Sequence, residues 1–158
     1  MYNEIHGDLI QLAKEGNFDV IAHGCNCMCA MGAGIAPQMV KAFGVNQYDL
    51  EQPYTRGDIN KLGQIEWYIE REGPIPFVIN AYTQYSYGRN HADGVSKPLD
   101  YDALTLCMRK INHRFKGLRI GLPQIGAGLA GGDWERIKQI IQTELKDCDV
   151  TVVIYKKD

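Results

Sequence analysis

Short apolar segments that suit strands alternate along the chain with segments of helical spacing. Residues 18–23 ("FDVIAH") and 77–83 ("FVINAYT") are apolar runs typical of buried strands, and residues 64–70 ("QIEWYIE") alternate between polar and apolar positions. Residues 118–123 ("LRIGLP") and 150–155 ("VTVVIY") are two further apolar runs. The pattern therefore predicts at least five strands.

Three segments between these strands repeat their apolar residues at helical spacing. The first begins near Gly34 and is expected to end at Gly44, while Asp100 and Asp133 are expected to cap the other two at their N-termini. The apolar faces consist of Ile35, Met39 and Phe43 in the first helix, Leu104, Met108, Ile111 and Phe115 in the second, and Trp134, Ile137, Ile141 and Leu145 in the third.

This order of elements predicts an α/β fold. Strands separated by helices of about ten to fifteen residues are typical of βαβ crossovers, which produce parallel strands. We expect a single domain over residues 1–158, built as a three-layer α/β/α sandwich with a central mixed, mostly parallel sheet. Ligands of such folds gather at the carboxyl ends of the strands, where loops lead into helix N-termini.

Composition and charge exclude several classes of protein. The chain has 45% hydrophobic and 23% charged residues and a formal net charge of −2, so a long basic surface for nucleic acid is not expected. No apolar run is long enough to span a membrane, and the N-terminus lacks the features of a secretory signal. Five cysteines, an odd number, favour a reducing cytoplasmic location over a disulfide-bonded secreted fold.

Three of these cysteines are crowded into the segment "GCNCMCAMGAGIAP" at 24–37. His23, Cys25, Cys27 and Cys29 have the composition of a zinc site, but alternate residues of a strand lie about 6.8 Å apart, too far to share one ion. Buried, reduced thiols that act as small hydrophobic groups are the favoured interpretation, and a curled loop would leave zinc open. No cofactor or metal is expected.

Two glycine-rich turns occupy the positions where ligands are expected. Residues 31–36 ("MGAGIA") follow the strand at 18–23, and residues 126–134 ("GAGLAGGDW") follow the strand at 118–123. Glycine lets the backbone approach a ligand closely, and the helix N-terminus behind it suits a phosphate. Neither turn has the Walker A or GxGxxG pattern, so a pair of loops that holds a diphosphate is predicted instead.

The sequence resembles the macro domain family across nearly the whole chain. The resemblance rests on "GDL" at 7–9, "AHGCN…MGAGIA", "GLPQIGAGLAGGDW" and "VTVVIY", in this order. Within the family it is most similar to the branch that contains ADP-ribose-1″-phosphate phosphatases, terminal ADP-ribose glycohydrolases and antitoxins that remove ADP-ribose from DNA. The resemblance implies that the chain binds ADP-ribose.

The resemblance also implies which residues bind this ligand. Asp8 would accept a hydrogen bond from the adenine amino group beside the Leu9 backbone, and Tyr155 would stack on the adenine. The amide of Asn26 would lie near the distal ribose. The diphosphate and the distal ribose would be bound by Gly32, Ala33, Gly34, Ile35, Thr83, Gly126, Ala127, Gly128, Leu129 and Ala130.

Two positions depart from the pattern of the glycohydrolases in this branch. Their lysine follows the threonine that matches Thr83, and here that position is Gln84, which is neither a nucleophile nor a cation. Their acid follows "GL" in the second loop, and here that position is Ala130. Asp133 comes three residues later and is a candidate for the acid as well as for a helix cap.

Other catalytic candidates come from the polar loop 85–98 and from the end of the strand at 18–23. In the loop, Arg89 is a candidate partner for a terminal phosphate, and His91 with Asp93 could form an acid–base pair. His23 ends its predicted strand on the ligand side. The catalytic candidates are Asn26, His23, His91, Asp93 and Asp133; a solvated loop with no catalytic role is the alternative for 85–98.

Three functions remain open. The first is hydrolysis of ADP-ribose 1″-phosphate to ADP-ribose and phosphate, in which water attacks phosphorus and no lysine is needed. The second is removal of ADP-ribose from modified protein or DNA, and the third is an ADP-ribose-binding module without catalytic activity. The expected partners are therefore ADP-ribose or its derivatives, with ADP-ribosylated protein or DNA as further possibilities, and no membrane.

Overall fold

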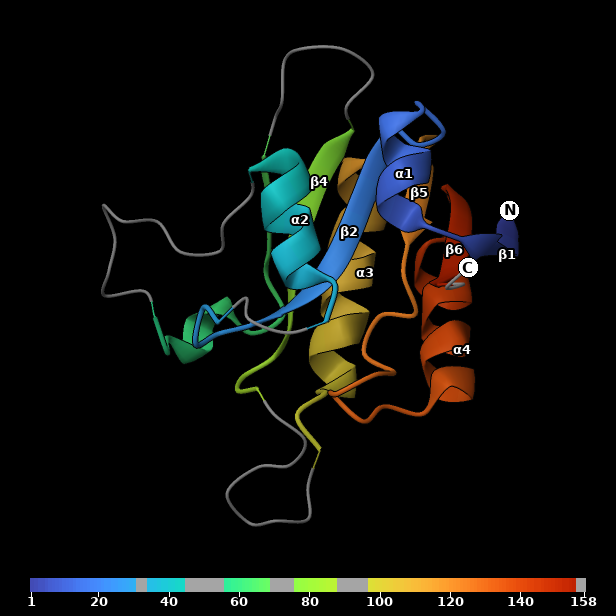
Figure 1. Cartoon of the computed structure of the whole chain (residues 1–158). Helices are drawn as coiled ribbons and strands as arrows, with labels where there is room; N and C mark the ends of the chain where they lie inside the picture. The colour runs from blue at the N-terminus through green and yellow to red at the C-terminus, as the bar shows by residue number, and fades with distance from the viewer. Residues whose placement is uncertain (31–33, 45–55, 69–75, 88–96, 156–158) are drawn as a thin grey trace.

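The computed structural model describes residues 1–30, 34–44, 56–68, 76–87 and 97–155 (Figure 1). Its strands are β1 (Tyr2–Gly7), β2 (Val20–Asn26), β3 (Ile65–Tyr68), β4 (Phe77–Gln84), β5 (Arg119–Leu122) and β6 (Asp149–Tyr155). Its helices are α1 (Leu9–Lys14), α2 (Ala36–Phe43), the short 3₁₀ helix η2 (Ile59–Lys61), α3 (Tyr101–Arg114) and α4 (Trp134–Glu144). None of the helices in this part of the chain has the length and apolar character that crossing a membrane requires.

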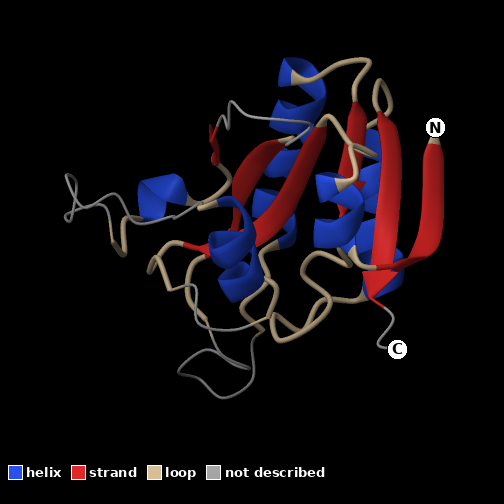
Figure 2. Cartoon of the chain, turned by 45° about the horizontal axis from the view of Figure 1, so that its top comes forward, coloured by secondary structure: helices blue, strands red, loops and turns tan. Residues whose placement is uncertain are grey.

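The strands form one sheet (Figure 2). Their order in it is β1-β6-β5-β2-β4-β3. All neighbouring pairs are parallel except β3 and β4, which pair antiparallel at one edge. The carboxyl ends of the five parallel strands therefore meet at one edge of the molecule. This confirms the predicted α/β class with a mostly parallel sheet.

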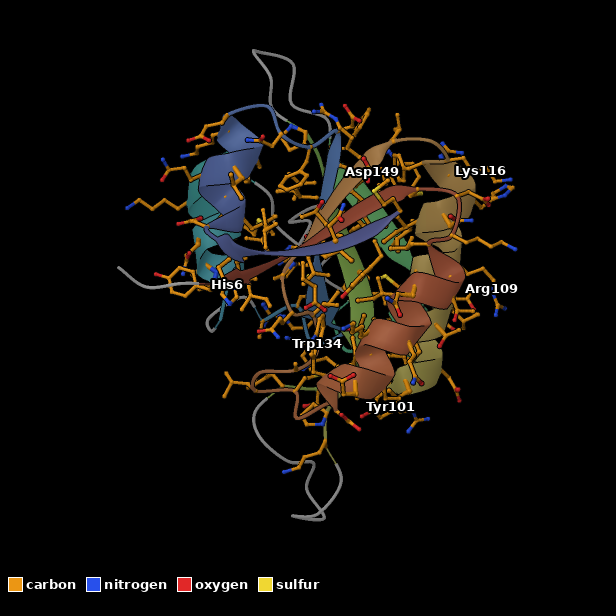
Figure 3. All side chains as sticks on the ribbon, turned by 90° about the vertical axis from the view of Figure 1, so that its right-hand side faces the viewer. His6, Tyr101, Arg109, Lys116, Trp134 and Asp149 are labelled. Atoms are coloured by element: carbon orange, nitrogen blue, oxygen red, sulfur yellow. The ribbon has the colours of Figure 1, made fainter. Side chains whose placement is uncertain are left out.

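Helices cover both faces of the sheet, as the sequence predicted (Figure 3). On one face, Met39 and Phe43 of α2 pack with Ile21 of β2, and the core there also includes residues of α1. On the other face, the apolar sides of α3 and α4 share a larger core with β2, β4, β5 and β6. The structure buries the residues spaced for helical packing in these three helices, except that Ile35 and Trp134 are only partly buried against the cores.

The N-terminal strand and helix were not expected from the pattern. Four of the six residues of β1 are exposed, so the strand lacks the apolar run that reveals a buried strand. Its place is set by main-chain pairing with β6, in which Gly7 lies opposite Tyr155. Strand β2 also continues to Asn26, three residues beyond the predicted end, and residues 69–70 of the third predicted strand lie outside the described residues.

Aspartates cap three of the four α-helices. Asp100 and Asp133 accept hydrogen bonds from the first turns of α3 and α4, as predicted, and Asp8 does the same for α1. Helix α2 differs, because its N-cap residue is Ile35, which makes no side-chain cap hydrogen bond, and no other described side chain bonds its first turn. Its free N–H groups are therefore available to a ligand.

Candidate functional site

A cleft of about 620 Å³ opens at the carboxyl ends of β2, β4 and β5. It lies between the two glycine-rich turns predicted from the sequence. Gly34 and Ile35 line it from the first turn, and Gly126, Gly128 and Leu129 line it from the second. This volume is in the range of small-molecule binding sites.

The first turn presents the uncapped start of α2 to the cleft. Ile35 and Ala36 line the cleft, and within the described residues the N–H groups of Gly34, Ile35 and Ala36 have no hydrogen-bond acceptor. A helix N-terminus concentrates positive partial charge, and no acidic residue lies in the first turn of α2. This arrangement suits a phosphate.

The second turn also leaves N–H groups unpaired. The N–H groups of Gly126, Gly128, Leu129 and Ala130 have no acceptor in the described part of the chain, and all four residues line the cleft. The turn is held by hydrogen bonds from Gly132 to the Gly126 carbonyl (2.8 Å) and from Gly131 to the Gly128 carbonyl (3.0 Å). Two sets of donors without acceptors among the described residues thus border one cleft, an arrangement that suits a diphosphate.

Asn26 lines the cleft, and its side-chain amide forms two hydrogen bonds with the main chain of Ala30. Its Oδ1 accepts from the N–H of Ala30 (3.1 Å) and its Nδ2 donates to the Ala30 carbonyl (2.8 Å). These bonds close the turn that leads into the first glycine loop. One N–H of the amide remains for a ligand, since Nδ2 carries two hydrogens.

Asp8 and Tyr155 lie side by side at the ends of β1 and β6, next along the sheet from β5 and its glycine turn. Gly7 pairs with Tyr155, whose side chain is 67% exposed, and Asp8 follows directly. Asp8 uses Oδ1 to cap α1, and its Oδ2 has no partner among the described residues. Leu9 is buried in the core, so only its main chain can contact a ligand.

The structure does not place His23 in the cleft. Because β2 continues to Asn26 and side chains alternate along a strand, His23 faces the α2 side of the sheet with Ile21, while Gly24 lines the cleft. His23 is fully buried and contacts Asn80 Oδ1 through Nε2 at 2.5 Å. Burial lowers its pKa to about 4, so it is neutral near pH 7 and has no path to a substrate.

Asp133 and Thr83 are also outside the cleft lining. Asp133 is exposed and caps α4 by accepting from the Glu135 N–H (3.1 Å). Thr83 is buried beneath Gly24, and its Oγ1 has no hydrogen-bond partner within the described residues. Ala127 packs partly against the core of α3 and α4 and does not line the cleft.

Four predicted site residues lie outside the described part of the chain. These are Gly32, Ala33, His91 and Asp93, together with Arg89 of the same polar loop. Their assigned roles stay predictions.

In the described part of the chain, the cleft lining has no ionisable acid, imidazole or cation. Gln84, at the position of the family's lysine, lines the cleft and donates from Nε2 to the Ser86 carbonyl (2.7 Å). Tyr87 and Gln124 also line the cleft and were not expected from the sequence. Both are polar residues just beyond a strand that ends at this edge, which is the signal that could have identified them.

The clustered cysteines are buried, reduced thiols, as the favoured interpretation expected. Cys25, Cys27 and Cys29 are each less than 8% exposed. Burial raises the pKa of Cys27 to about 11 and that of Cys29 above its usual value, so neither is an activated thiolate. Cys29 has a φ of 60°, unusual for a residue other than glycine, and lies in the turn that Asn26 closes.

Comparison with known proteins gives relatives that align along nearly the whole chain. No protein-family model matches it. An uncharacterised 17.5 kDa protein of Enterobacteria phage T4 is 34% identical, covering 96% of this chain and 95% of the phage protein. The human ADP-ribose glycohydrolase OARD1 is 28% identical (96% and 88% covered), and an ADP-ribose 1″-phosphate phosphatase of Candida albicans is 28% identical (90% and 92% covered).

Solved structures share the fold. The macrodomain of Thermus aquaticus DarG superposes with a TM-score of 0.69 at 22% identity, covering 99% of both chains. A Trypanosoma brucei macrodomain, solved in complex with ADP-ribose, superposes with a TM-score of 0.64 at 15% identity, covering 99% of this chain and 64% of the other. From the ordered motifs, the sheet with its paired glycine turns, and these relatives, the chain belongs to the macro domain family.

Proposed function

We propose that the cleft binds ADP-ribose and that the protein hydrolyses an ADP-ribose derivative at the distal ribose, with ADP-ribose 1″-phosphate as the best-fitting substrate. The observation that carries this proposal is the pair of N–H donor sets without acceptors among the described residues, at the start of α2 and in the turn after β5, on two sides of one cleft. A diphosphate between them would receive main-chain hydrogen bonds from both.

We infer the positions of the adenine and the distal ribose from the order of the strands. Adenine would lie toward β1 and β6, where the free Oδ2 of Asp8 can accept from its amino group and the exposed ring of Tyr155 can stack on it. The distal ribose would then lie toward β2 and β4, near Asn26 and Gln84. The complex of ADP-ribose with the trypanosomal macrodomain supports the choice of ligand.

The neutral lining of the described cleft favours phosphate hydrolysis over a lysine-dependent reaction. Water would attack phosphorus, the bond from phosphorus to the 1″ oxygen would break, and the leaving oxygen would take a proton to give ADP-ribose and phosphate. Free N–H groups would stabilise charge on the phosphoryl oxygens. His91 and Asp93 remain our candidates for proton transfer, and the Candida phosphatase supports the choice of reaction.

Removal of ADP-ribose from protein or DNA is the second candidate, supported by the similarity to human ADP-ribose glycohydrolase. One experiment separates the possibilities: calorimetry with ADP-ribose, followed by steady-state assays on ADP-ribose 1″-phosphate, ADP-ribosylated protein and ADP-ribosylated DNA. Phosphate release alone supports our proposal, and ADP-ribose release from a macromolecule replaces it with the second candidate. Tight binding without turnover on any substrate identifies a binding module, and absence of binding contradicts the assignment of the cleft.

We expect Tyr155→Ala to weaken ADP-ribose binding about five- to tenfold, because loss of an aromatic stack costs about 1 kcal/mol or somewhat more. The side chain is largely exposed at the end of β6, so the fold should be little affected. Tyr155→Phe is the matched control, since it keeps the ring, and it should bind like the wild type. Calorimetry measures both. Equal affinity in all three proteins would show that adenine does not lie on Tyr155.

A further inference from the structure

A second groove, of about 580 Å³, lies between β3 and the C-terminal half of α3. Four of its lining side chains are basic: Arg109, Lys110, His113 and Arg114. Helix α3 begins next to the carboxyl end of β4, where the Asp100 N–H bonds the Thr83 carbonyl, and runs away from that edge (Figure 1). The groove therefore lies well away from the ADP-ribose cleft, and the two share no lining residue.

The basic residues form one surface of the helix. Lys110 and Arg114 are four residues apart, as are Arg109 and His113, and residues at this spacing are neighbours on a helix. Figure 3 shows Arg109 on the outer side of α3, with Lys116 in the turn beyond it. The whole protein has a net charge of −2, so this concentration of cations is a local feature.

Two of these cations are held in fixed positions while donors remain free. The guanidinium of Arg114 lies over the Trp67 ring, with its carbon 4.8 Å from the ring centre, and none of its N–H groups has an acceptor in the described part of the chain. Lys110 Nζ donates to the Gly63 carbonyl and to Gln64 Oε1, both at 2.8 Å, which leaves one of its three N–H groups. A cation that is already oriented loses less conformational entropy when it binds an anion.

Contacts within the protein account for only part of this charge. Arg109 forms a two-point ion pair with Glu144 of α4, which joins the two helices and neutralises one cation. The acceptors of Lys110 are both neutral, and the exposed side chain of His113 has no partner among the described residues. Among the described residues, the positive charges of Lys110 and Arg114 therefore have no anionic partner.

We infer that this groove is a second binding site, whose ligand is a phosphate group. Arg114 offers a planar pair of donors, Lys110 offers a single donor, and His113 lies beside them on the helix. Donors from three separate side chains suit a tetrahedral anion, with several oxygens in different directions, better than a planar carboxylate. Free phosphate compounds and nucleic-acid strands both carry this group.

Trp67 makes the site measurable. The protein has two tryptophans, so in a Trp134→Phe background the fluorescence comes from Trp67, which contacts Arg114. In this background, pyrophosphate and a short oligothymidylate are titrated separately at low salt. Each is titrated again into Arg114→Gln, Lys110→Gln and Lys116→Gln. The last variant is the matched control, because it removes one nearby exposed positive charge outside the groove.

We expect saturable binding that weakens at least tenfold in Arg114→Gln and Lys110→Gln and stays unchanged in Lys116→Gln. Stronger binding of the oligonucleotide, with a slope of log K against log salt of about −1.4 for two neutralised phosphates, would identify a nucleic-acid strand as the source. Stronger binding of pyrophosphate would identify a free phosphate compound. ADP-ribose affinity should be unchanged in all three variants, so this inference stands or fails independently of the proposed function.

Three results would overturn the inference. The first is absence of binding by either probe. The second is an equal loss in Lys116→Gln, which would show only unspecific attraction to positive charge. The third is equally tight binding of polyglutamate with the same dependence on Arg114 and Lys110, which would mean that the groove takes acidic peptides.

Discussion

Gly128→Val should weaken ADP-ribose binding by about two orders of magnitude, or about 2.8 kcal/mol, while leaving the fold intact. Gly128 lines the cleft, its backbone is outside the left-handed region, and an added Cβ would have no heavy atom within 4 Å. The valine side chain would therefore occupy space that we assign to the diphosphate. Calorimetry with ADP-ribose measures the loss, and urea unfolding should give a stability within about 0.5 kcal/mol of the wild type.

Two other substitutions in this turn separate loss of ligand space from loss of stability. Gly128→Ala adds a single methyl group and should give a smaller loss of affinity with the same stability. Gly132→Ala should instead reduce stability and affinity together, because its Cβ would lie 2.7 Å from the Gly126 carbonyl oxygen and would also overlap Leu99. Unchanged affinity in Gly128→Val would mean that the ligand does not pass between the two turns.

The two glycine turns could be recognised from the sequence because the backbone conformation itself requires glycine. Gly34, Gly126 and Gly131 have φ values of 66°, 78° and 75°, which other residues adopt only with strain. Their positions after apolar strands placed them at the carboxyl edge of the sheet. The spacing of apolar residues likewise revealed α2, α3 and α4, since each helix buries one face.

Features that depend on strand pairing or on where a strand ends could not be predicted from the apolar pattern. Strand β1 is mostly exposed and is held by its main-chain bonds to β6, so no apolar pattern marks it. His23 was wrongly expected in the cleft because β2 was predicted to end there. The strand continues three residues further, so its carboxyl end is formed by Gly24 and Asn26, which line the cleft, while His23 lies on the α2 face. Tyr87 and Gln124 lie in loops, and the sequence pattern does not predict where a loop lies in the folded protein.

His23 belongs instead to a chain of polar groups on the α2 face of the sheet. The amide nitrogen of Asn80 donates to Glu66 Oε1 (3.0 Å), so the amide oxygen faces His23 and the imidazole donates from Nε2. Tyr82 also donates to Glu66 Oε1 (2.6 Å), and the Lys61 ammonium lies 3.9 Å from Glu66 Oε2. This series of polar groups thus ends at a buried, neutral His23, whose Nδ1 has no partner in the part of the protein that the structure describes.

Acid should therefore begin to destabilise this protein at pH values well above those at which carboxylates titrate. The pKa of His23 is about 4 in the folded state and near 6.5 when the chain unfolds, so between these values the unfolded state binds more protons and stability falls as pH decreases. The full loss by pH 4 is roughly 3 kcal/mol, of which about 2 kcal/mol is lost between pH 7 and pH 5. Urea unfolding followed by circular dichroism across this interval measures it.

His23→Leu should remove this slope, because no imidazole remains to be protonated. At pH 7 it should also lower stability by about 1–3 kcal/mol, since Asn80 Oδ1 stays buried without its donor, and this deficit should shrink toward pH 5 as the wild type loses stability. His113→Gln is the matched control, because it removes an exposed histidine and should keep the wild-type slope. Asp19 and Glu4 do not confound the measurement, since ion pairs and hydrogen bonds lower their pKa values and their contributions are lost only in stronger acid. Equal slopes in the wild type and His23→Leu would show that protonation of His23 is not coupled to folding.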